Sequence, residues 1–286
     1  MTISNLIDAH THIWTPDLTA YPLASGFTQA DMKPPSFTPE EFMQHASPCG
    51  VERAVLIQMS FHGLDNSYVL DAIREAPQKF VGVAVVDENS EDLGGQLETL
   101  RARGIVGLRL VTLRIDADSW VDSQSAKNVF REAADQKIAA CFLCNPGELS
   151  AIDRVCSHYP ELTVVIDHLA RIGAGGDINE AHISQLINLS RHKNVYVKVS
   201  AFYALGKQQP PYLDFLPMIH RLRDAYGAER LMWASDCPFQ LIPGHTYRDS
   251  IELITERANF LSAEEKLHLL QGTAEQVFFD RASSGR

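Results

Sequence analysis

Eight short runs of apolar and β-branched residues recur along the chain, and they limit its fold more than any other feature. They cover residues 6–13, 53–59, 80–86, 105–111, 138–144, 162–168, 195–201 and 230–236. Each run is followed by a segment with helical patterning, which is typical of repeated βα units in a parallel sheet. Eight parallel strands are the number that closes a TIM barrel. We therefore predict an α/β fold, a (β/α)₈ TIM barrel, as a single domain over residues 1–286.

The segments between the strands are amphipathic, and several open with capping residues. They cover residues 38–46, 67–76, 91–104, 125–136, 149–159, 178–192 and 211–227. A loop rich in Pro and Gly follows the eighth strand, and two helical stretches then occupy residues 251–261 and 262–279. Ser262 and Glu265 open the second stretch as a capping box. We expect the earlier helices to ring the barrel and the last two to close its bottom and side.

Residues 14–38 form a long segment with neither a helical nor a strand period. Loops of this length in a compact domain are usually functional or disordered. Two interpretations stay open, an active-site lid or wall and a packed connector without a role.

Charge and composition restrict the partners of the protein. The net charge is −11, and the sequence contains no run of Lys and Arg that could form a basic patch. Both features argue against nucleic acid as a partner. No stretch approaches the ~20 apolar residues of a membrane span, and residues 1–14 lack a leader pattern. Five scattered cysteines favour a reducing compartment. We expect a cytoplasmic protein with a small-molecule partner and no membrane or nucleic acid, and we leave a homo-oligomer open.

Two of the cysteines, Cys141 and Cys144, have the spacing of a redox or zinc motif. They lie in an apolar run that we read as a strand, where residues i and i+3 point to opposite faces. We therefore predict that both are small buried side chains rather than a functional pair.

The strongest local signal is the stretch Asp8-Ala9-His10-Thr11-His12 in the first strand. An i, i+2 spacing places His10 and His12 side by side on one face of that strand. In a barrel this face points into the lumen near the C-terminal mouth, where the active sites of this fold lie. Two converging imidazoles suit a metal ion or a clamp for a carbonyl oxygen.

Two further strands end in residues that can do chemistry. The sixth ends in Asp167-His168 and the eighth in Asp236. Because both positions lie at strand C-termini, we expect His168 and Asp236 to meet the two histidines of the first strand.

Motifs that resemble one family cover nearly the whole chain. They are IDAHTHI in the first strand, GLRL in the fourth, VIDHLAR in the sixth, VKVSAFY in the seventh, MWASDCP in the eighth and GTAEQVFF near the end. Their order and spacing resemble the amidohydrolase superfamily. Within it they are most similar to the amidohydrolase 2 or lactonase-like branch, which includes 2-pyrone-4,6-dicarboxylate hydrolase and sugar lactonases.

The resemblance implies roles for these residues. His10, His12 and His168 would surround the scissile carbonyl, directly or through a divalent metal, and Asp236 would be the general base that activates water. The physical chemistry agrees, because a carboxylate among imidazoles or beside a cation stays ionised at neutral pH and can take a proton from water.

The chain departs from the metal-rich pattern of this superfamily. Members with two metals have a bridging carboxylate or modified Lys on a middle strand, whereas the fifth strand here reads ACFLCN. The seventh strand offers Lys198 and Ser200 but no His. The choice is then between a single zinc at His10, His12, His168 and Asp236 and no metal at all. The resemblance favours catalysis without a required cofactor, because an activated lactone is an easier electrophile than an amide.

Three arginines suggest the charge of the substrate. Arg109 lies at the mouth of the fourth strand, Arg114 follows it, and Arg171 lies three residues beyond His168. Guanidinium groups bind carboxylates bidentately, so we predict an acidic lactone as substrate, with salt bridges within the chain as the alternative role. The pyrone hydrolase has a further arginine after its seventh strand, where this chain reads Ser-Ala-Phe-Tyr. That difference weakens the case for its particular dicarboxylate.

Other polar residues near strand ends are weaker candidates. We predict substrate contacts for Gln58, Tyr203 and Lys198, although Lys198 could equally pair with an acid inside the barrel. Asn145, Tyr21 and His62 are also near the mouth. We treat the remaining histidines as surface residues: His45, His158, His182, His192, His220, His245 and His268.

These observations together predict a hydrolase that opens the ring of a carboxylated lactone by water attack. One alternative is a zinc-dependent decarboxylase of the same superfamily, which shares the histidines and the aspartate but generally needs tightly bound metal. Another is a barrel that binds a ligand without catalysis, because a fold does not determine a function. A nuclease of the TatD type is disfavoured because it needs an acidic metal ligand from a middle strand.

Overall fold

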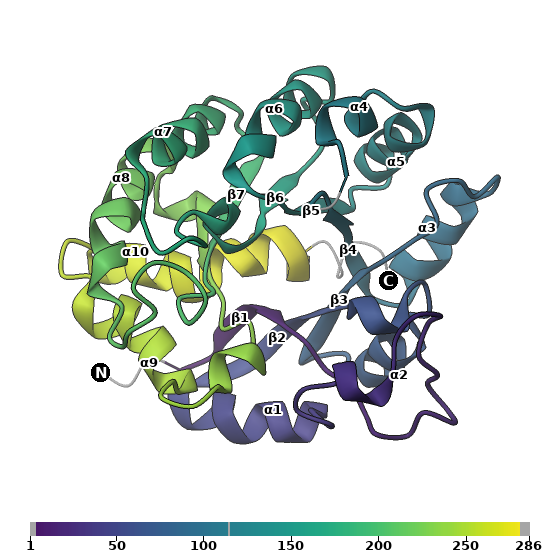
Figure 1. Cartoon of the computed structure of the whole chain (residues 1–286), viewed down its shortest axis with the longest axis horizontal. Coiled ribbons are helices and arrows are strands. Elements are labelled where there is room, and N and C mark those ends of the chain that lie inside the picture. Colours follow the sequence, from purple (N-terminus) through teal and green to yellow (C-terminus); the bar gives the residue numbers. More distant parts are fainter. Residues whose placement is uncertain (1–3, 114, 281–286) are drawn as a thin grey trace.

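Eight parallel strands form the sheet of the protein, and they pair in sequence order from β1 to β8 (Figure 1). The computed structural model describes residues 4–113 and 115–280. The strands are β1 (Leu6–Thr11), β2 (Val51–Ile57), β3 (Phe80–Ala84), β4 (Ile105–Val111), β5 (Ala139–Leu143), β6 (Val164–Ile166), β7 (Val195–Val199) and β8 (Leu231–Trp233). This arrangement confirms the predicted TIM barrel.

The first and last strands meet along a seam that brings the barrel to closure. Thr11 pairs with Cys237, and the backbone N–H of His12 donates to the carbonyl of Cys237 at 2.8 Å. The N–H of Asp236 donates to the carbonyl of His10 at 2.9 Å. The seam therefore fixes the ends of β1 and β8 in register with each other.

Helices surround the sheet on its outer side (Figure 1). They are α1 (Pro39–Ala46), α2 (Ser67–Glu75), α3 (Leu93–Ala102), α4 (Ala117–Val121), α5 (Gln124–Asp135), α6 (Leu149–His158), α7 (Glu180–Asn188), α8 (Leu216–Tyr226), α9 (Tyr247–Glu252) and α10 (Ala263–Leu267). Capping explains several of their starts; Thr38 accepts from the N–H of Glu41 at the start of α1. The short α4 was not predicted. None of the described helices is long and apolar enough to cross a membrane.

Two layers of apolar side chains make up the core. Ile7, Val55 and Val165 face the inside of the barrel, where Val277 and Phe278 of the last helical segment pack with them. The opposite faces of the strands pack against the surrounding helices. The chain beyond α10 therefore closes the bottom of the barrel, as predicted.

The cysteine pair follows the predicted alternation. Cys141 packs with the cluster inside the barrel, whereas Cys144 belongs to the cluster between the sheet and the helices. Both thiols are buried, and neither forms a disulfide. The prediction of two structural side chains on opposite faces is confirmed.

Candidate active site

A cavity of about 290 Å³ opens at the C-terminal ends of the strands. Six functional side chains line it: His12, Arg109, His168, Arg171, Tyr203 and Asp236. These residues are far apart in sequence and follow β1, β6, β7 and β8 or lie on β4. The end of the barrel that carries active sites in this fold therefore gathers most of the residues predicted for catalysis and substrate binding.

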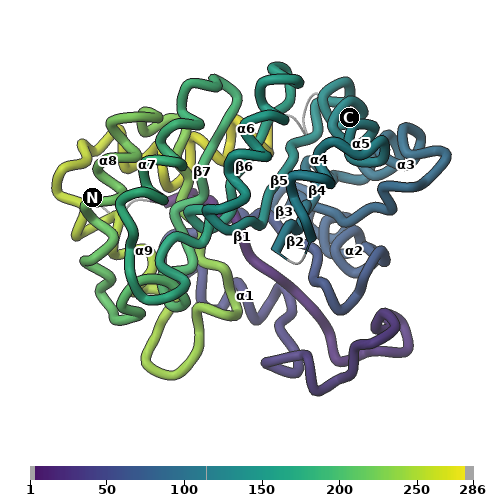
Figure 2. The backbone as a smooth tube through the Cα atoms, turned by 45° about the horizontal axis from the view of Figure 1, so that its top comes forward, coloured from purple at the N-terminus to yellow at the C-terminus, as the bar shows by residue number. Residues whose placement is uncertain are grey.

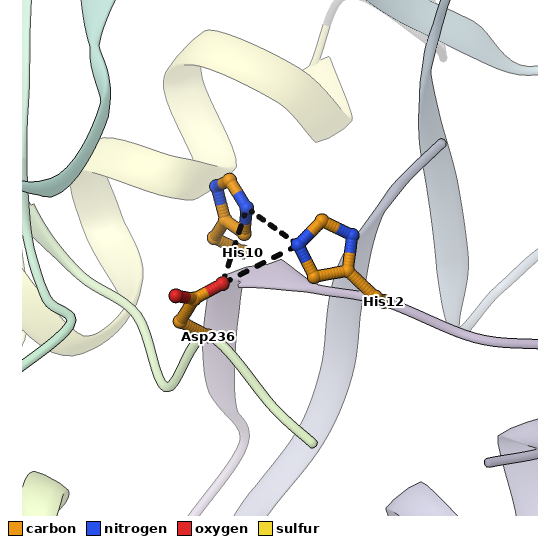
Figure 3. A group of neighbouring side chains, drawn as sticks. All are labelled: His10, His12 and Asp236. Atoms are coloured by element: carbon orange, nitrogen blue, oxygen red, sulfur yellow. Dashed lines mark hydrogen bonds and ion pairs between the residues drawn. The ribbon is translucent and has the colours of Figure 1, made fainter. Parts of the chain in front are cut away.

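Asp236 lies against His10 and His12 of the first strand region (Figure 3), and His168 approaches the same carboxylate. Its Oδ1 is 3.3 Å from Nε2 of His12, 3.5 Å from Nε2 of His10 and 3.8 Å from Nε2 of His168. All four side chains are buried, and His10 is fully so, beneath the others and outside the lining of the cavity. The structure thus brings together the four residues predicted from the strand ends.

A buried carboxylate that the sequence reasoning left without a role aligns this cluster. Asp8 accepts hydrogen bonds from the backbone N–H groups of His10 and Ser235 at 3.1 and 2.9 Å, and from the hydroxyl of Tyr247 at 2.9 Å. It therefore ties the end of β8 to β1 and orients the chain just before Asp236. Burial raises the pKa of Asp8 to about 6, and the hydrogen bonds from Ser235 and His10 oppose that rise.

An unusual turn presents His168 and Arg171. Residues 168–171 all have positive φ values of 52°, 55°, 53° and 56°, which is one turn of left-handed helix. Such backbone costs an L-residue roughly 1–2 kcal/mol. Strain of this kind concentrates at functional sites, and this turn directs both side chains into the same cavity.

The electrostatics favour an ionised Asp236. Burial raises its pKa, but the positive ends of His168, His12 and His10 outweigh burial and hold the pKa well below its usual range. Burial lowers the pKa of His10 and of His12. At neutral pH the cluster therefore holds a carboxylate beside the uncharged imidazoles of His10 and His12, which is suited to accept a proton from water.

Two arginines in the wall have no acidic partner. Nη1 of Arg109 donates to the carbonyl of Gln58 at 2.5 Å, and Nη1 of Arg171 donates to Oδ1 of Asn145 at 2.7 Å. Among the described residues no carboxylate lies within 4.0 Å of either guanidinium. Both therefore keep charge and donors available for an anion in the cavity.

Of the other predicted substrate contacts, only Tyr203 lies at the cavity among the described residues. The hydroxyl of Tyr203 donates to Oδ2 of Asp236 at 2.7 Å, at the wall of the cavity. Gln58 is buried behind Arg109, and its amide donates to the carbonyl of Asp65. Lys198 is fully buried below the histidines, with its Nζ 2.9 Å from Oδ1 of Asp167. Arg114 lies outside the described residues.

The weaker candidates do not reach the cavity. Tyr21 donates to Asp71, and Nδ1 of His62 lies 3.2 Å from the carbonyl of Pro22. The histidines treated as surface residues are all exposed or half-buried. Asn145 acts through Arg171 rather than at the cavity wall.

Residues 14–38 pack beside α2 rather than over the cavity. Tyr21 contacts α2 through Asp71, and the backbones of Trp14 and Phe37 hydrogen-bond to each other at 2.9 Å. In Figure 2 the segment is the purple loop that runs from β1 past α2. None of its residues lines the cavity. Its end, at Lys33, Pro34, Ser36 and Phe37, lines a neighbouring cavity that shares Phe239 with this one, so the wall and the connector both stay predictions.

Sequence reasoning also missed Asp167 as a member of the site. The carboxylate is fully buried, and its Oδ1 lies 3.6 Å from Nδ1 of His10. Burial raises the pKa of Asp167, but Lys198 and His10 outweigh it and lower the pKa far below the usual range. The residue precedes His168 in the motif of the sixth strand, and that position was its only signal in the sequence.

The spacing of the cluster suits a metal ion, but the hydrogen bonds of His10 do not. His10, His12 and Asp236 hold donor atoms within 4.8 Å of one another, as do His10, Asp167 and His168. A metal ligand needs a free lone pair on Nε2 of His10 in the first group. Nζ of Lys198 lies 3.1 Å from Nδ1 of His10, and a neutral imidazole that accepts from an ammonium there carries its proton on Nε2.

Comparisons with known proteins agree on one family for this chain. The model of the family described as "Amidohydrolase" matches residues 7–279. L-fucono-1,5-lactonase of Burkholderia ambifaria is 27% identical over 248 residues, which cover 84% of this chain and 82% of the lactonase. The 2-pyrone-4,6-dicarboxylate hydrolase of Comamonas testosteroni is 25% identical over 281 residues, which cover 91% of this chain and 86% of that enzyme.

A solved structure extends the likeness to the fold. An amidohydrolase from Burkholderia multivorans, crystallised with bound zinc, superimposes with a TM-score of 0.82. It is 18% identical in sequence, and the match covers 96% of this chain and 99% of the other. At this identity the likeness supports the barrel, while the zinc is a property of that protein.

Proposed function

Because this chain belongs to the amidohydrolase family, we propose that it is a lactonase that opens the ring of a carboxylated lactone. Its curated relatives include hydrolases of lactones, which supports hydrolysis of a cyclic ester. The observation that carries the proposal is the position of Asp236, among three histidines and at a cavity that Arg109 and Arg171 line without an acidic partner among the described residues.

The chemistry needs one proton acceptor and one group of hydrogen-bond donors. Asp236 takes a proton from water through Oδ1, and the water oxygen bonds to the carbonyl carbon. The imidazole N–H of His168 at the cavity wall stabilises the negative charge that develops on the carbonyl oxygen, and His10 and His12 hold Asp236 in place. The ring C–O bond then breaks, and the departing oxygen takes the proton back from Asp236. The products are one hydroxyl and one carboxylic acid on the same opened chain, and the acid releases its proton to solvent to become a carboxylate.

The two arginines specify the class of lactone. Arg109 and Arg171 lie on the walls around the carboxylate, and each has donors without an acidic partner among the described residues. A carboxylate on the lactone would pair with one or both guanidinium groups and hold the ring over Asp236. A cavity of about 290 Å³ suits one small ring with its substituents.

The first experiment is hydrolysis of a lactone panel by the purified protein, with and without a chelator. The panel contains 2-pyrone-4,6-dicarboxylate, a muconolactone and an aldono-lactone. We expect turnover of a carboxylated lactone that survives the chelator. Asp236→Asn should reduce kcat at least 100-fold, in line with the 10²–10⁴ that a general base contributes.

The matched control is Asp224→Asn, which neutralises an exposed carboxylate on α8. It should leave kcat unchanged. Turnover that survives in Asp236→Asn would remove Asp236 from the role of base. Release of CO₂ from an aromatic acid only after zinc is added would favour the decarboxylase instead, and saturable binding without turnover would favour a binding protein.

A further inference from the structure

A buried chain of polar contacts runs beneath the cavity. Nζ of Lys198 lies 2.9 Å from Oδ1 of Asp167 and 3.1 Å from Nδ1 of His10. Nε2 of His10 lies 3.2 Å from Nε2 of His12, and Nδ1 of His12 lies 2.8 Å from the carbonyl oxygen of Ile57. The side chains of Lys198, Asp167 and His10 are fully buried. Water therefore does not supply alternative partners to this chain.

The two ends of this row of polar contacts, Lys198 and the carbonyl of Ile57, determine which ring nitrogens carry protons. An ammonium group only donates hydrogen bonds, so Nδ1 of His10 accepts from Lys198. A carbonyl oxygen only accepts, so Nδ1 of His12 donates to Ile57. In an uncharged imidazole the other nitrogen then has the opposite role. His10 carries its proton on Nε2, and His12 keeps a lone pair on Nε2.

The two assignments agree where the rings meet. Nε2–H of His10 faces two acceptors, the lone pair of Nε2 of His12 at 3.2 Å and Oδ1 of Asp236 at 3.5 Å. The reverse tautomer of His10 would place an N–H against the ammonium of Lys198. It would also place two lone pairs against each other at the 3.2 Å contact with His12.

We propose that Lys198 is a positioning residue that keeps the proton of His10 on Nε2 and so makes His10 a hydrogen-bond donor rather than a metal ligand. In the group of His10, Asp167 and His168 the ammonium of Lys198 itself occupies the place of a cation. For catalysis, which rests on the proposed function, the consequence is an N–H group that supports His12 and Asp236 from beneath the cavity. In a zinc site the same histidine would instead bind the metal through a lone pair on Nε2.

The direct test is the tautomer of His10 in the folded protein, measured by NMR on a sample labelled with ¹⁵N in histidine. Nε2 couples to both ring protons, whereas Nδ1 couples to only one, so the spectrum shows which nitrogen carries hydrogen. His10→Gln identifies the signals of His10. We expect the protonated nitrogen to be Nε2. A proton on Nδ1 in the wild-type protein would overturn the proposal.

A pair of variants tests whether Lys198 is the cause. Lys198→Met removes the donor and leaves Asp167 buried without its partner, which endangers folding. The double variant Lys198→Met with Asp167→Leu replaces both charges with apolar side chains of similar size, so it keeps the test feasible. Ser200→Ala is the matched control, because Ser200 lies 2.8 Å from Nδ1 of His168 and not beside His10.

In Lys198→Met, Oδ1 of Asp167 at 3.6 Å is left to accept from Nδ1 of His10, so we expect the Nδ1–H tautomer and a zinc affinity at least tenfold higher. In the double variant, which removes that acceptor too, we expect the Nε2–H tautomer to persist. Competition with a chromophoric chelator measures that affinity. Ser200→Ala should change the signals of His168 and leave those of His10 in place. If Lys198→Met keeps both the tautomer and the zinc affinity of the wild type, Lys198 does not set the state of His10. None of these readouts needs a lactone, so failure of the proposed function would be seen separately.

Discussion

The two oxygens of Asp236 have different surroundings, and this difference assigns them different tasks. Oδ2 accepts the hydroxyl of Tyr203 at 2.7 Å, whereas Oδ1 faces the Nε2 atoms of the three histidines. The bond from Tyr203 holds the carboxylate in one orientation. Oδ1 is therefore the oxygen that can take a proton from water in the cavity.

Arg171 is the best residue with which to test the charge of the substrate. Arg171→Met should lower kcat/KM for a carboxylated lactone by about 10- to 100-fold, because a hydrogen bond to a charged group contributes about 1.5–3 kcal/mol. A neutral aldono-lactone, which has no carboxylate to lose, should be hydrolysed almost as fast as before. Steady-state kinetics on the two substrates measure the difference. An equal loss on both would show that Arg171 supports the fold of the cavity and does not recognise the acid.

Residue types and strand ends were enough to predict His10, His12, His168 and Asp236 as one cluster. The Lys198–Asp167 pair was not predictable, because it depends on the register of two strands. Ile166 pairs with Val197, so the next residues along β6 and β7 come together. Periodicity in the sequence gives the face of a strand but not which residue of the neighbouring strand lies beside it.

Several strands are shorter than the apolar runs that predicted them. The run 162–168 contains only Val164–Ile166 as strand, and the run 230–236 contains only Leu231–Trp233. The reason lies in the backbone, because His168 and Asp236 have φ values of 52° and 61°. Residues with positive φ cannot continue a β-strand. The chain thus leaves the sheet where it must turn a functional side chain into the cavity, which apolar patterning does not reveal.

The left-handed turn at 168–171 gives a prediction about Ala170. Ala170→Gly should change the free energy of unfolding by less than about 1 kcal/mol, because relief of positive φ offsets the flexibility that glycine adds to the unfolded chain. Ala133→Gly in α5 is the matched control, since Ala133 is also fully buried but has no such strain to relieve. It should cost about 1 kcal/mol more. Urea unfolding of both variants measures the difference, and equal losses would contradict the argument.

The start of α10 predicts a pH-dependent contribution from Glu265. The backbone N–H of Ser262 holds the pKa of Glu265 below its usual value of 4.5, and Arg223 adds to the effect. A lowered pKa in the folded state stabilises the protein above the unfolded pKa, and this contribution is lost as pH falls through the folded value. Glu265→Gln should cost about 0.5–1 kcal/mol near pH 7, at the low end for an exposed cap.

That cost should shrink as the pH is lowered towards about 4 and below, because the wild-type carboxylate is then protonated as well. Urea unfolding at several pH values follows the difference between the two proteins. Glu264→Gln serves as the control, since Glu264 lies in the same helical turn while the Ser262 bond goes to Glu265. A difference between Glu265→Gln and wild type that does not change with pH would show that charge plays no part.

At the scale of the whole molecule, the count of strands was predictable and the closure was not. Eight runs gave the barrel, but the seam depends on Asp8, whose carboxylate joins the backbone at Ser235 to the hydroxyl of Tyr247. Those contacts bridge residues more than two hundred positions apart. No local sequence pattern predicts these contacts, because they form only after folding has brought β1 and β8 together.

Closure of the sheet predicts how the cysteines respond to unfolding. A closed barrel has no edge strand from which the sheet can open, so its strands should lose their order together. Cys141, Cys144, Cys156 and Cys237 are at most 4% exposed and report on β5, α6 and the seam. Cys49 is half-buried. Burial raises the pKa of the Cys156 thiol to about 12 and raises that of Cys144 and Cys237 still more clearly, which adds chemical protection to steric protection.

We therefore expect a thiol reagent to modify Cys49 first in the native protein and the four buried cysteines together, in one transition, as urea is increased. Peptide mass spectrometry after pulse labelling identifies each site, and Cys49→Ser should abolish the early reaction without moving the transition. The seam has one isolated bridge, whereas the other neighbouring strands pair at three or more positions, so it is the place where the barrel can open first. Modification of Cys237 at a lower urea concentration than Cys144 would show that the barrel opens between β1 and β8 before the rest of the sheet unfolds. In that case Asp236 and His10 would separate first, and activity would be lost ahead of the fold.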